Sequence, residues 1–548
     1  MPSYTKDQSI ALFKDYERML QARTTTETTW QGLANLMRPL RVDIRQRRSP
    51  GQQQTQYVFD GTAIKAQGDL ASALSGSMTS TDFQWFAQRM GLEELNDDWE
   101  TRVWLEECAQ RVFLAFQQSN LGSELHELYQ DLVVFGTGCM WMDEKPIVSA
   151  KWNGFVFKTV APGRYVLAED AEGKPRKIGS EISMSYQAAA DKFGASALSH
   201  QSQEILKRNP EDMLKILRFI QPYVGATGGR KMYELTFHEM DQKHYLGGQY
   251  LRRLRCLAPR WEKASDEVYG RGRGHVAYPD VATLNRAVEL RLRQWAKAVD
   301  PAVLTVDDGV IGKLRLMHGT RTMVRNLDAV KAFDTGAKFD VANFQEERLQ
   351  IAIRNYFYAD QLQLPSKQYM TAYEIASHIE LMQRLLAPTT GRLKEELFNP
   401  LIDYAFDEMM VKGMLPPPPP IVIQAAMQGY TDINVVYTSP LTRSQRANEM
   451  GAFQQVTAGS QVLIANEPEL LDNFDGDMML REAAAATGVP GRWLRSPQAR
   501  DEKRQARMQA LAQQQEMAMK EQAAKATKNL TAAAADLGSL APQQGETA

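Results

Sequence analysis

The spacing of hydrophobic positions along the chain predicts a mainly helical protein. From Lys6 to Met37 apolar residues recur at helical intervals, and Pro39 interrupts the pattern. A basic stretch overlaps this break, and we expect its side chains to lie on the surface: Arg38, Arg41, Arg45, Arg47 and Arg48.

The chain from there to about residue 277 mixes helical and strand-like patterns. Trp104 to Tyr129 has the helical period, whereas the short runs Phe155 to Val160 and Met232 to Phe237 are typical of strands. The fold class that accounts for both is α+β, mainly helical, with residues 1–277 as its body.

A long amphipathic helix is predicted over residues 278–299. Pro279 suits its first turn, Pro301 ends it, and one apolar stripe runs along it: Leu284, Val288, Leu292, Trp295 and Val299. The other face carries Arg286, Glu289, Arg293 and Lys297, with Glu289 and Arg293 spaced for an ion pair. This charged face is either solvated or in contact with a neighbouring subunit or DNA.

A small β-containing insert follows at 300–342. Strand-like residues from Val303 to Leu316 flank a turn at Asp307 and Asp308, and Lys313 and Arg315 alternate with leucines beyond it.

A second helix is predicted over 343–358, and Pro365 then breaks the period in a polar loop at 359–370. The loop contains one cation, Lys367, among Gln361, Gln363, Ser366 and Gln368. It is either an ordinary connection between helices with Lys367 solvated, or a mobile loop whose Lys367 contacts DNA phosphates transiently.

The C-terminal third begins with a capping box at Thr371 and a helix over 371–413. Pro388 and Pro400 should bend it, and Gly413 should end it in the left-handed conformation. The run 416–420 predicts a polyproline spacer. Beyond it we expect a strand at 435–437, a helix at 439–451, a polar helix opened by Ser496 and Pro497 that runs towards Lys528, and disorder over 529–548.

Charge and cysteine content narrow the function classes. The 548 residues include 64 Lys and Arg against 66 Asp and Glu, a formal net charge of −2. This balance argues against a protein that coats DNA, so any DNA contact comes from local patches or is weak. The three cysteines, the absence of a signal peptide pattern and the absence of an apolar run of about 20 residues predict a soluble chain made in a reducing cytoplasm.

The sequence contains no convincing active-site motif. Gly225 to Lys231 lacks the spacing of a phosphate loop, and Gly270 to Gly274 is interpreted as a structural loop. Neither His126-Glu127 nor His238-Glu239 extends to a zinc motif, and Asp472 to Asp477 suits a surface turn better than a calcium loop. We therefore expect no catalytic residues, no cofactor and no metal site.

A set of spaced motifs resembles the head-to-tail connector, or portal, proteins of short-tailed, podovirus-type phages. Early motifs are Tyr57 to Ala63, Leu70 to Leu74 and Trp85-Phe86. Middle motifs are Tyr269 to Gly272, Pro279-Asp280 and Leu284-Asn285, and late ones are Met370 to Glu374, Gly391-Arg392 with Glu395 or Glu396, and Ser439 to Arg446. Gly61, Arg273, Tyr373 and Thr442 depart from the usual residues.

The resemblance implies a ring of twelve subunits at one capsid vertex, through which double-stranded DNA is packaged and ejected. It divides the subunit into a wing (1–277, with the kinked helix 371–413), a stem (278–299 and 343–358), a clip (300–342), a tunnel loop (359–370), a crown (414–500) and a C-terminal polar helix with a disordered tail (501–548). The stem residues Arg286, Glu289, Arg293 and Lys297 would face the channel or a neighbouring subunit. Asp307, Asp308, Lys313 and Arg315 would lie in the docking part of the clip.

The implied partners are other copies of the chain, passing DNA, a terminase motor, a tail adaptor, and capsid and scaffolding proteins, with no membrane. The location is the virion, after assembly in the host cytoplasm. Two alternatives stay open: another ring-shaped tail or collar protein, and a packaging ATPase or nuclease. The missing phosphate loop and missing carboxylate or metal cluster argue against the second.

Overall fold

A computed structural model describes residues 2–538 except 42, 46–48, 50, 147–151, 224–231, 300–302, 306–309, 312–322, 325–329, 333–338, 363–387, 429–432, 438–475, 478–479 and 482–492. The chain divides into two compact units. The first unit consists of Met1–Ala87, Cys108–Pro416 and Val435–Thr442. The second unit consists of Gln88–Glu107, Pro417–Asn434 and Arg443–Ala548.

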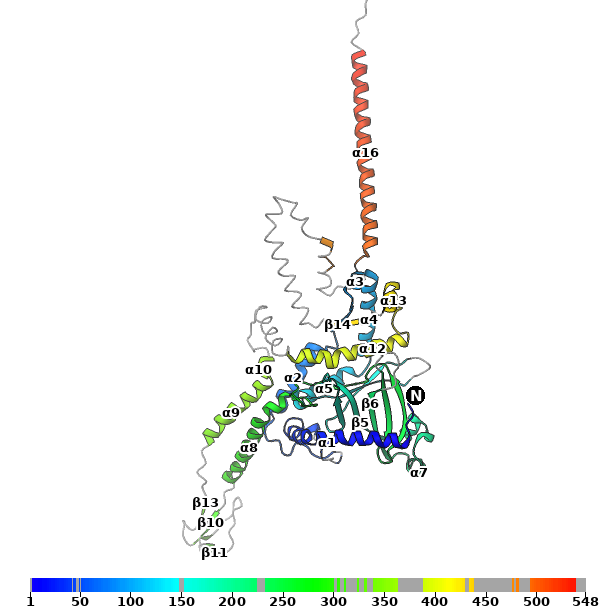
Figure 1. Cartoon of the computed structure of the whole chain (residues 1–548). Helices are drawn as coiled ribbons and strands as arrows, with labels where there is room; N and C mark the ends of the chain where they lie inside the picture. Colours follow the sequence, from blue (N-terminus) through cyan, green and yellow to red (C-terminus); the bar gives the residue numbers. More distant parts are fainter. Residues whose placement is uncertain are drawn as a thin grey trace, which may run out of the picture. The chain divides into compact units, whose positions relative to one another are not determined.

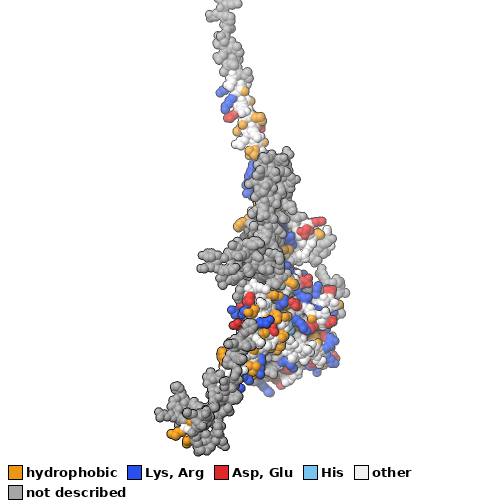
Figure 2. All heavy atoms as spheres, turned by 90° about the vertical axis from the view of Figure 1, so that its left-hand side faces the viewer, with side chains coloured by type: hydrophobic (Ala, Val, Ile, Leu, Met, Phe, Trp, Pro, Cys, Tyr) orange, Lys and Arg blue, Asp and Glu red, His pale blue; other side chains and the backbone are white. Residues whose placement is uncertain are grey.

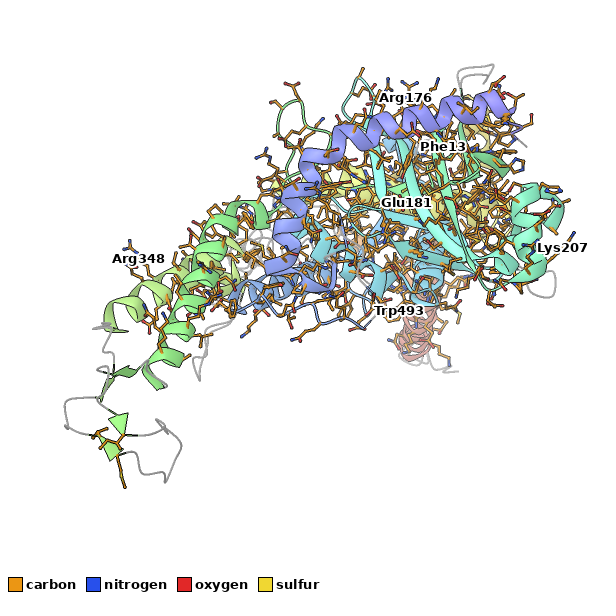
Figure 3. All side chains as sticks on the ribbon, turned by 90° about the horizontal axis from the view of Figure 1, so that it is seen from below. Phe13, Arg176, Glu181, Lys207, Arg348 and Trp493 are labelled. Carbon is orange, nitrogen blue, oxygen red and sulfur yellow. The ribbon has the colours of Figure 1, made fainter. Side chains whose placement is uncertain are left out.

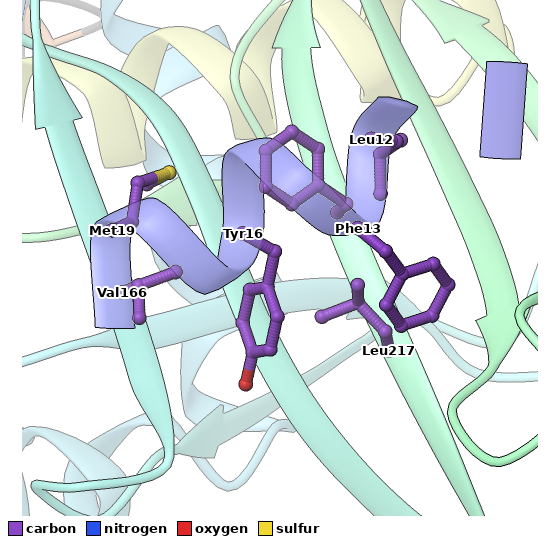
Figure 4. Packing of buried hydrophobic residues seen from close by; sticks show 7 residues of the cluster. Leu12, Phe13, Tyr16, Met19, Val166 and Leu217 are labelled. Atoms are coloured by element: carbon purple, nitrogen blue, oxygen red, sulfur yellow. The ribbon is translucent and has the colours of Figure 1, made fainter. Parts of the chain in front are cut away.

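The first unit is built on a five-stranded antiparallel sheet covered by the N-terminal helix. The strands run in the order β4 (Tyr165–Glu169), β5 (Pro175–Ser185), β6 (Met213–Pro222), β7 (Tyr233–Glu239) and β8 (His244–Leu251). The predicted helix α1 (Lys6–Met37) is confirmed, with a capping box between Thr5 and Gln8, and Figure 3 shows it lying across the strands. Its apolar stripe packs on the sheet (Figure 4): Leu12, Phe13, Tyr16 and Met19 against Val166, Leu217 and Phe219.

A smaller three-stranded sheet and a helical layer complete this body. Its order is β3 (Phe155–Thr159), β2 (Met140–Glu144) and β9 (Cys256–Leu257). The strands predicted at Phe155 and Met232 are confirmed as β3 and β7. The helical segment predicted from Trp104 is two helices, α4 (Trp99–Gln117) and α5 (Leu121–Phe135), and α5 packs on α2 (Thr62–Met78). Short elements fill the connections: η1 (Pro39–Arg41), α6 (Tyr186–Phe193), η2 (Ala195–Ala197) and α7 (His200–Arg208).

The surface prediction for the basic stretch is wrong for its first member. Arg38 is buried and forms an ion pair with Asp131 of α5, with 2.9 Å between Nη1 and Oδ1. The ion pair supplies the countercharge that an interior guanidinium needs. Arg45 is exposed as predicted, and Arg47 and Arg48 lie outside the described residues.

Two helices extend side by side from the body (Figure 1). The first, α8 (Arg273–Val299), begins earlier than the predicted residue 278, so Pro279 lies inside it rather than in its first turn. The second, α9 (Phe339–Tyr356), is followed by a turn at Tyr358 and by α10 (Ala359–Leu362). The loop predicted from residue 359 therefore begins with a short helix.

The insert between these helices contains two small antiparallel sheets. β10 (Val303–Thr305) pairs with β13 (Val330–Ala332), and β11 (Val310–Ile311) pairs with β12 (Met323–Val324). Strands thus flank the predicted turn, but they pair with later strands and not with each other. The site residues Asp307, Asp308, Lys313 and Arg315 lie outside the described residues.

The helix predicted over 371–413 is described from residue 388 onward. Residues 388–393 are helical, a π-helical turn follows at Lys394–Phe398, and α12 (Asn399–Val411) continues from it. Pro400 has no backbone N–H to donate to the preceding turn, and the π turn lies just before it. The missing hydrogen bond is the physical reason for the predicted irregularity. Gly413 has a φ of +68°, which confirms the left-handed end.

The second unit contains α3 (Glu93–Asp97), α13 (Pro420–Met427) and α16 (Pro497–Gly538). Pro420 begins α13, so the spacer is shorter than predicted. Ser496 caps α16 as predicted, because its Oγ accepts from Ala499 N at 3.2 Å.

The predicted disorder is wrong for residues 529–538, where Ala-rich sequence with high helix propensity continues α16. The strand predicted at 435–437 is confirmed within β14 (Ile433–Tyr437), which pairs with β1 (Phe86–Met90). The helix predicted at 439–451 lies outside the described residues. Among the residues that the structure does describe, no helix is long and apolar enough to cross a membrane.

Candidate functional site: the paired helices α8 and α9 and their attachment

The charged face of α8 forms a local ion cluster. Glu289 bridges Arg286 and Arg293, with carboxylate oxygens 2.7 and 2.6 Å from the two guanidinium groups, so the predicted Glu289–Arg293 pair is confirmed. Hydrogen bonds from Arg286 and the nearby charge of both arginines hold the pKa of the Glu289 carboxyl below its usual range. Lys297 is exposed beyond the cluster. Three cations and one carboxylate leave this face positively charged.

The apolar stripe of α8 is covered only along its first half. Leu284 and Val288 are buried, whereas Leu292 and Trp295 are 41% and 47% exposed. Arg291 joins the helices through an ion pair with Glu346 of α9 at 2.5 Å, and its guanidinium lies 5.3 Å from the Trp295 ring centre. Figure 2 looks at the side on which α8 and α9 lie and shows hydrophobic side chains exposed among charged ones. The outer half of α8 therefore presents an apolar surface that the described chain leaves uncovered.

Hydrogen bonds from one asparagine attach α8 to the N-terminal motif. Asn285 Oδ1 accepts from Phe59 N at 2.7 Å, and its Nδ2 donates to Tyr57 O at 2.9 Å. The Asp60 carboxylate in turn accepts from Gln350 Nε2 of α9 at 2.9 Å. Two motifs far apart in sequence, and both helices, are thus joined at one point.

The beginning of α8 is fitted against the end of α5 with no room for a side chain. A Cβ on Gly272 would lie 2.5 Å from Val133 O, and a Cβ on Gly274 would lie 2.4 Å from Val134 O. The loop interpretation therefore holds up to Gly272, while Gly274 belongs to α8. This contact explains why the helix starts before the predicted proline.

A buried ion network attaches the π turn to the body. Arg260, 2% exposed, donates from its backbone N, Nε and Nη2 to the Glu396 carboxylate at 2.9, 3.2 and 2.6 Å. Its Nη1 also pairs with Glu169. Glu396, and not the exposed Glu395, is therefore the structural carboxylate of the late motif.

The structure describes only part of the predicted site. Arg286, Glu289, Arg293 and Lys297 lie together on α8, and Gln361 lies in α10. The other loop residues, Gln363, Ser366, Lys367 and Gln368, lie outside the described residues. Sequence reasoning missed the Arg260 network because its partners are up to 136 residues apart, and no local spacing marks them.

The described residues contain no group of three or more His, Cys, Asp or Glu side chains that could hold a metal ion. In the acidic turn, Asp477 is engaged by Arg500 and Arg504, each at 2.7 Å. Ion pairing, and not cation binding, accounts for this carboxylate in the structure.

The family profile and the two curated relatives agree with one another. A family profile described as "Bacteriophage head to tail connecting protein" matches residues 11–494. A protein named "Probable portal protein" from Bordetella phage BPP-1 is 25% identical over 470 residues, covering 81% of each chain. A "Portal protein" from Salmonella phage epsilon15 is 24% identical over 501 residues, covering 87% of each. A solved chain titled "Neck of native GTA particle computed with C12 symmetry" is 11% identical, with a TM-score of 0.31, covering 72% of this chain and 85% of that one.

Proposed function

Because the chain belongs to the bacteriophage head-to-tail connecting protein family, we propose that it is the portal subunit of a phage particle. Copies of the chain form a closed ring, with twelve members, at one vertex of the capsid. Double-stranded DNA enters and leaves through the axial hole. The protein acts as a conduit and docking platform and not as an enzyme.

The observation that carries this proposal is the uncovered outer half of α8. Leu292 and Trp295 are large, apolar and nearly half exposed, and the positive residues Arg286 and Arg293 lie on the same helix. A face of this kind suits contact with a different surface of an identical neighbour, and repetition of such a head-to-tail contact closes into a ring. In that arrangement α8 and α9 are the stem, and residues 1–277 with the helix over 371–413 form the wing.

The charge of the chain supports passage of DNA. A strongly basic protein would bind the phosphate backbone tightly and in a salt-dependent way. A net charge of −2 over 548 residues gives no such strong binding. Isolated cations such as Lys297, and Lys367 of the proposed tunnel loop, would give weak contacts that break as DNA advances.

The remaining assignments follow from the family. The insert at 300–342 is the clip, where the terminase motor docks during packaging and the tail adaptor afterwards. Residues 414–500 form the crown, and capsid and scaffolding proteins contact the outside of the ring. Assembly takes place in the host cytoplasm, and the finished ring resides in the virion.

Native mass spectrometry and negative-stain images of the purified chain test the ring. We expect wild-type protein to form rings with a central hole, and Leu292→Asp to lose them because a buried carboxylate would be unpaired. Met213→Asp is the matched control, because Met213 is exposed but lies on β6, away from the stem. Only monomers or two-fold dimers of wild type would refute the ring. Intact rings of Leu292→Asp would refute the interface.

A further inference from the structure

The body of the first unit contains a cavity of about 320 Å³ with a strongly basic lining. Four cationic side chains contribute to its wall, Arg41, Lys158, Arg164 and Arg218, against the single carboxylate of Glu181. None of them belongs to the proposed stem, clip or tunnel loop. The cavity lies within one compact unit, so its shape does not depend on any other part of the chain.

Strand register brings the wall residues together from both sheets. Ser180 of β5 is directly opposite Arg218 of β6, and Trp141 of β2 is directly opposite Lys158 of β3. The Arg218 guanidinium stacks on the Trp141 ring, with Cζ 3.7 Å from the ring centre. The two sheets thus meet at a cation–aromatic contact, which makes a rigid wall for the cavity.

The charges around the cavity are only partly neutralised. Arg218 forms a two-pronged pair with Asp143 at 2.8 and 2.5 Å, whereas Arg164 is 3.5 Å from Glu181. Arg41 pairs with Glu127 and Asp131 of α5, whereas Lys158 is exposed. Burial and then the charge of Arg218 lower the pKa of the neighbouring Lys192 ammonium, while Asp143 acts in the opposite direction.

The same wall holds buried donors without acceptors. In the described structure no hydrogen-bond partner exists for the Nε of Arg218, the Nε of Arg41, the indole nitrogen of Trp141 or the hydroxyl of Ser180. Buried polar groups are nearly always hydrogen-bonded, so the wall contains more polar atoms than its own partners satisfy. Three of the four can only donate, so the surplus is of donors.

We propose that this cavity binds a phosphate group, either as inorganic phosphate or as the terminal phosphate of a nucleic acid strand. Phosphate offers only acceptor oxygens, and arginine is the side chain best suited to it. The volume lies at the lower end of ligand sites, which run from roughly 300 to 1,000 Å³. This site is separate from the stem, so phosphate binding can be tested independently of ring formation.

Isothermal titration of the full chain with sodium phosphate, against sodium chloride at equal ionic strength, tests the site. We expect saturable binding that weakens about tenfold in Lys158→Gln and in Arg164→Gln, since each removes a charge-assisted contact. Lys207→Gln is the matched control, because Figure 3 shows Lys207 on α7 at the edge of the body. Heats no larger than those of chloride, or equal weakening in all three variants, would overturn the proposal.

Competition with short oligonucleotides identifies the source of the phosphate. If a 5′-phosphorylated strand displaces phosphate and its unphosphorylated twin does not, the site accepts a strand end. If neither competes while phosphate binds, inorganic phosphate is the ligand. The site would be overturned if phosphate shows no saturable binding and both strands bind equally well. If Lys158→Gln and Arg164→Gln also leave that binding unchanged, the strands are held only by general attraction to their backbone.

Discussion

Replacing Glu396 by alanine should destabilise the body far more than the same change at its neighbour Glu395. The Glu396 carboxylate accepts three hydrogen bonds from Arg260, a residue 2% exposed, and is itself 13% exposed. Removing one partner of a buried ion pair typically costs about 3–5 kcal/mol, because the other charge remains in a poorly solvated site. Glu169 still pairs with Arg260, so we expect the lower end, about 3 kcal/mol.

Urea unfolding followed by tryptophan fluorescence measures the effect. Glu395→Ala is the control, since Glu395 is exposed in the same π turn and should change the free energy of unfolding by no more than about 0.5 kcal/mol. Glu396→Gln should fall between the two, because the amide keeps one acceptor but loses the charge. Equal stability of Glu396→Ala and Glu395→Ala would refute the assignment of Glu396 as the carboxylate that attaches the π turn.

Four further changes test other features. Gly272→Ala should lower the free energy of unfolding by about 3 kcal/mol in thermal unfolding, because its Cβ would overlap the Val133 carbonyl. Gly68→Ala is the control: it lies in open space on α2 and should raise the free energy of unfolding by up to about 1 kcal/mol. Asn285→Ala should lower the free energy of unfolding by about 1–2 kcal/mol, because the hydrogen bonds to Tyr57, Phe59 and Asp60 are lost. Unchanged proteolysis at Tyr57 would contradict this attachment. Burial lowers the pKa of His238 to about 4 from an ordinary 6.5. The free energy of unfolding should therefore fall by about 3 kcal/mol between pH 6.5 and pH 4, and it should fall less in His238→Phe. Lys367→Glu should preserve the ring but reduce DNA packaging through phosphate repulsion, and wild-type packaging would refute the tunnel loop.

Local rules predicted local structure well. The capping residue Ser496, the left-handed Gly413 and the Glu289–Arg293 pair were all predictable, because each depends on residues within four positions. Helix α16 continues past the predicted end near Lys528 because its alanine-rich C-terminal residues have high helix propensity.

Features that depend on distant residues were not predictable in this way. The start of α8 is set by contact of Gly272 and Gly274 with α5, and the burial of Arg38 is set by Asp131. Period and composition carry no information on such partners. The same limit applied to the site, where the charged face of α8 was predicted from spacing, but the Asn285 and Arg260 contacts required the fold.

If the proposed ring forms through the outer half of α8, the stability of this helix depends on protein concentration. Leu284 is buried by its own chain, whereas Leu292 and Trp295 are nearly half exposed among the described residues and would be buried by the proposed neighbouring subunit. Any contact that forms only between folded subunits adds stability by mass action. The outer turns of α8 should therefore be least protected from solvent exchange in dilute protein, and they should gain protection with each added subunit, so that ordering of this helix and oligomer growth are one equilibrium.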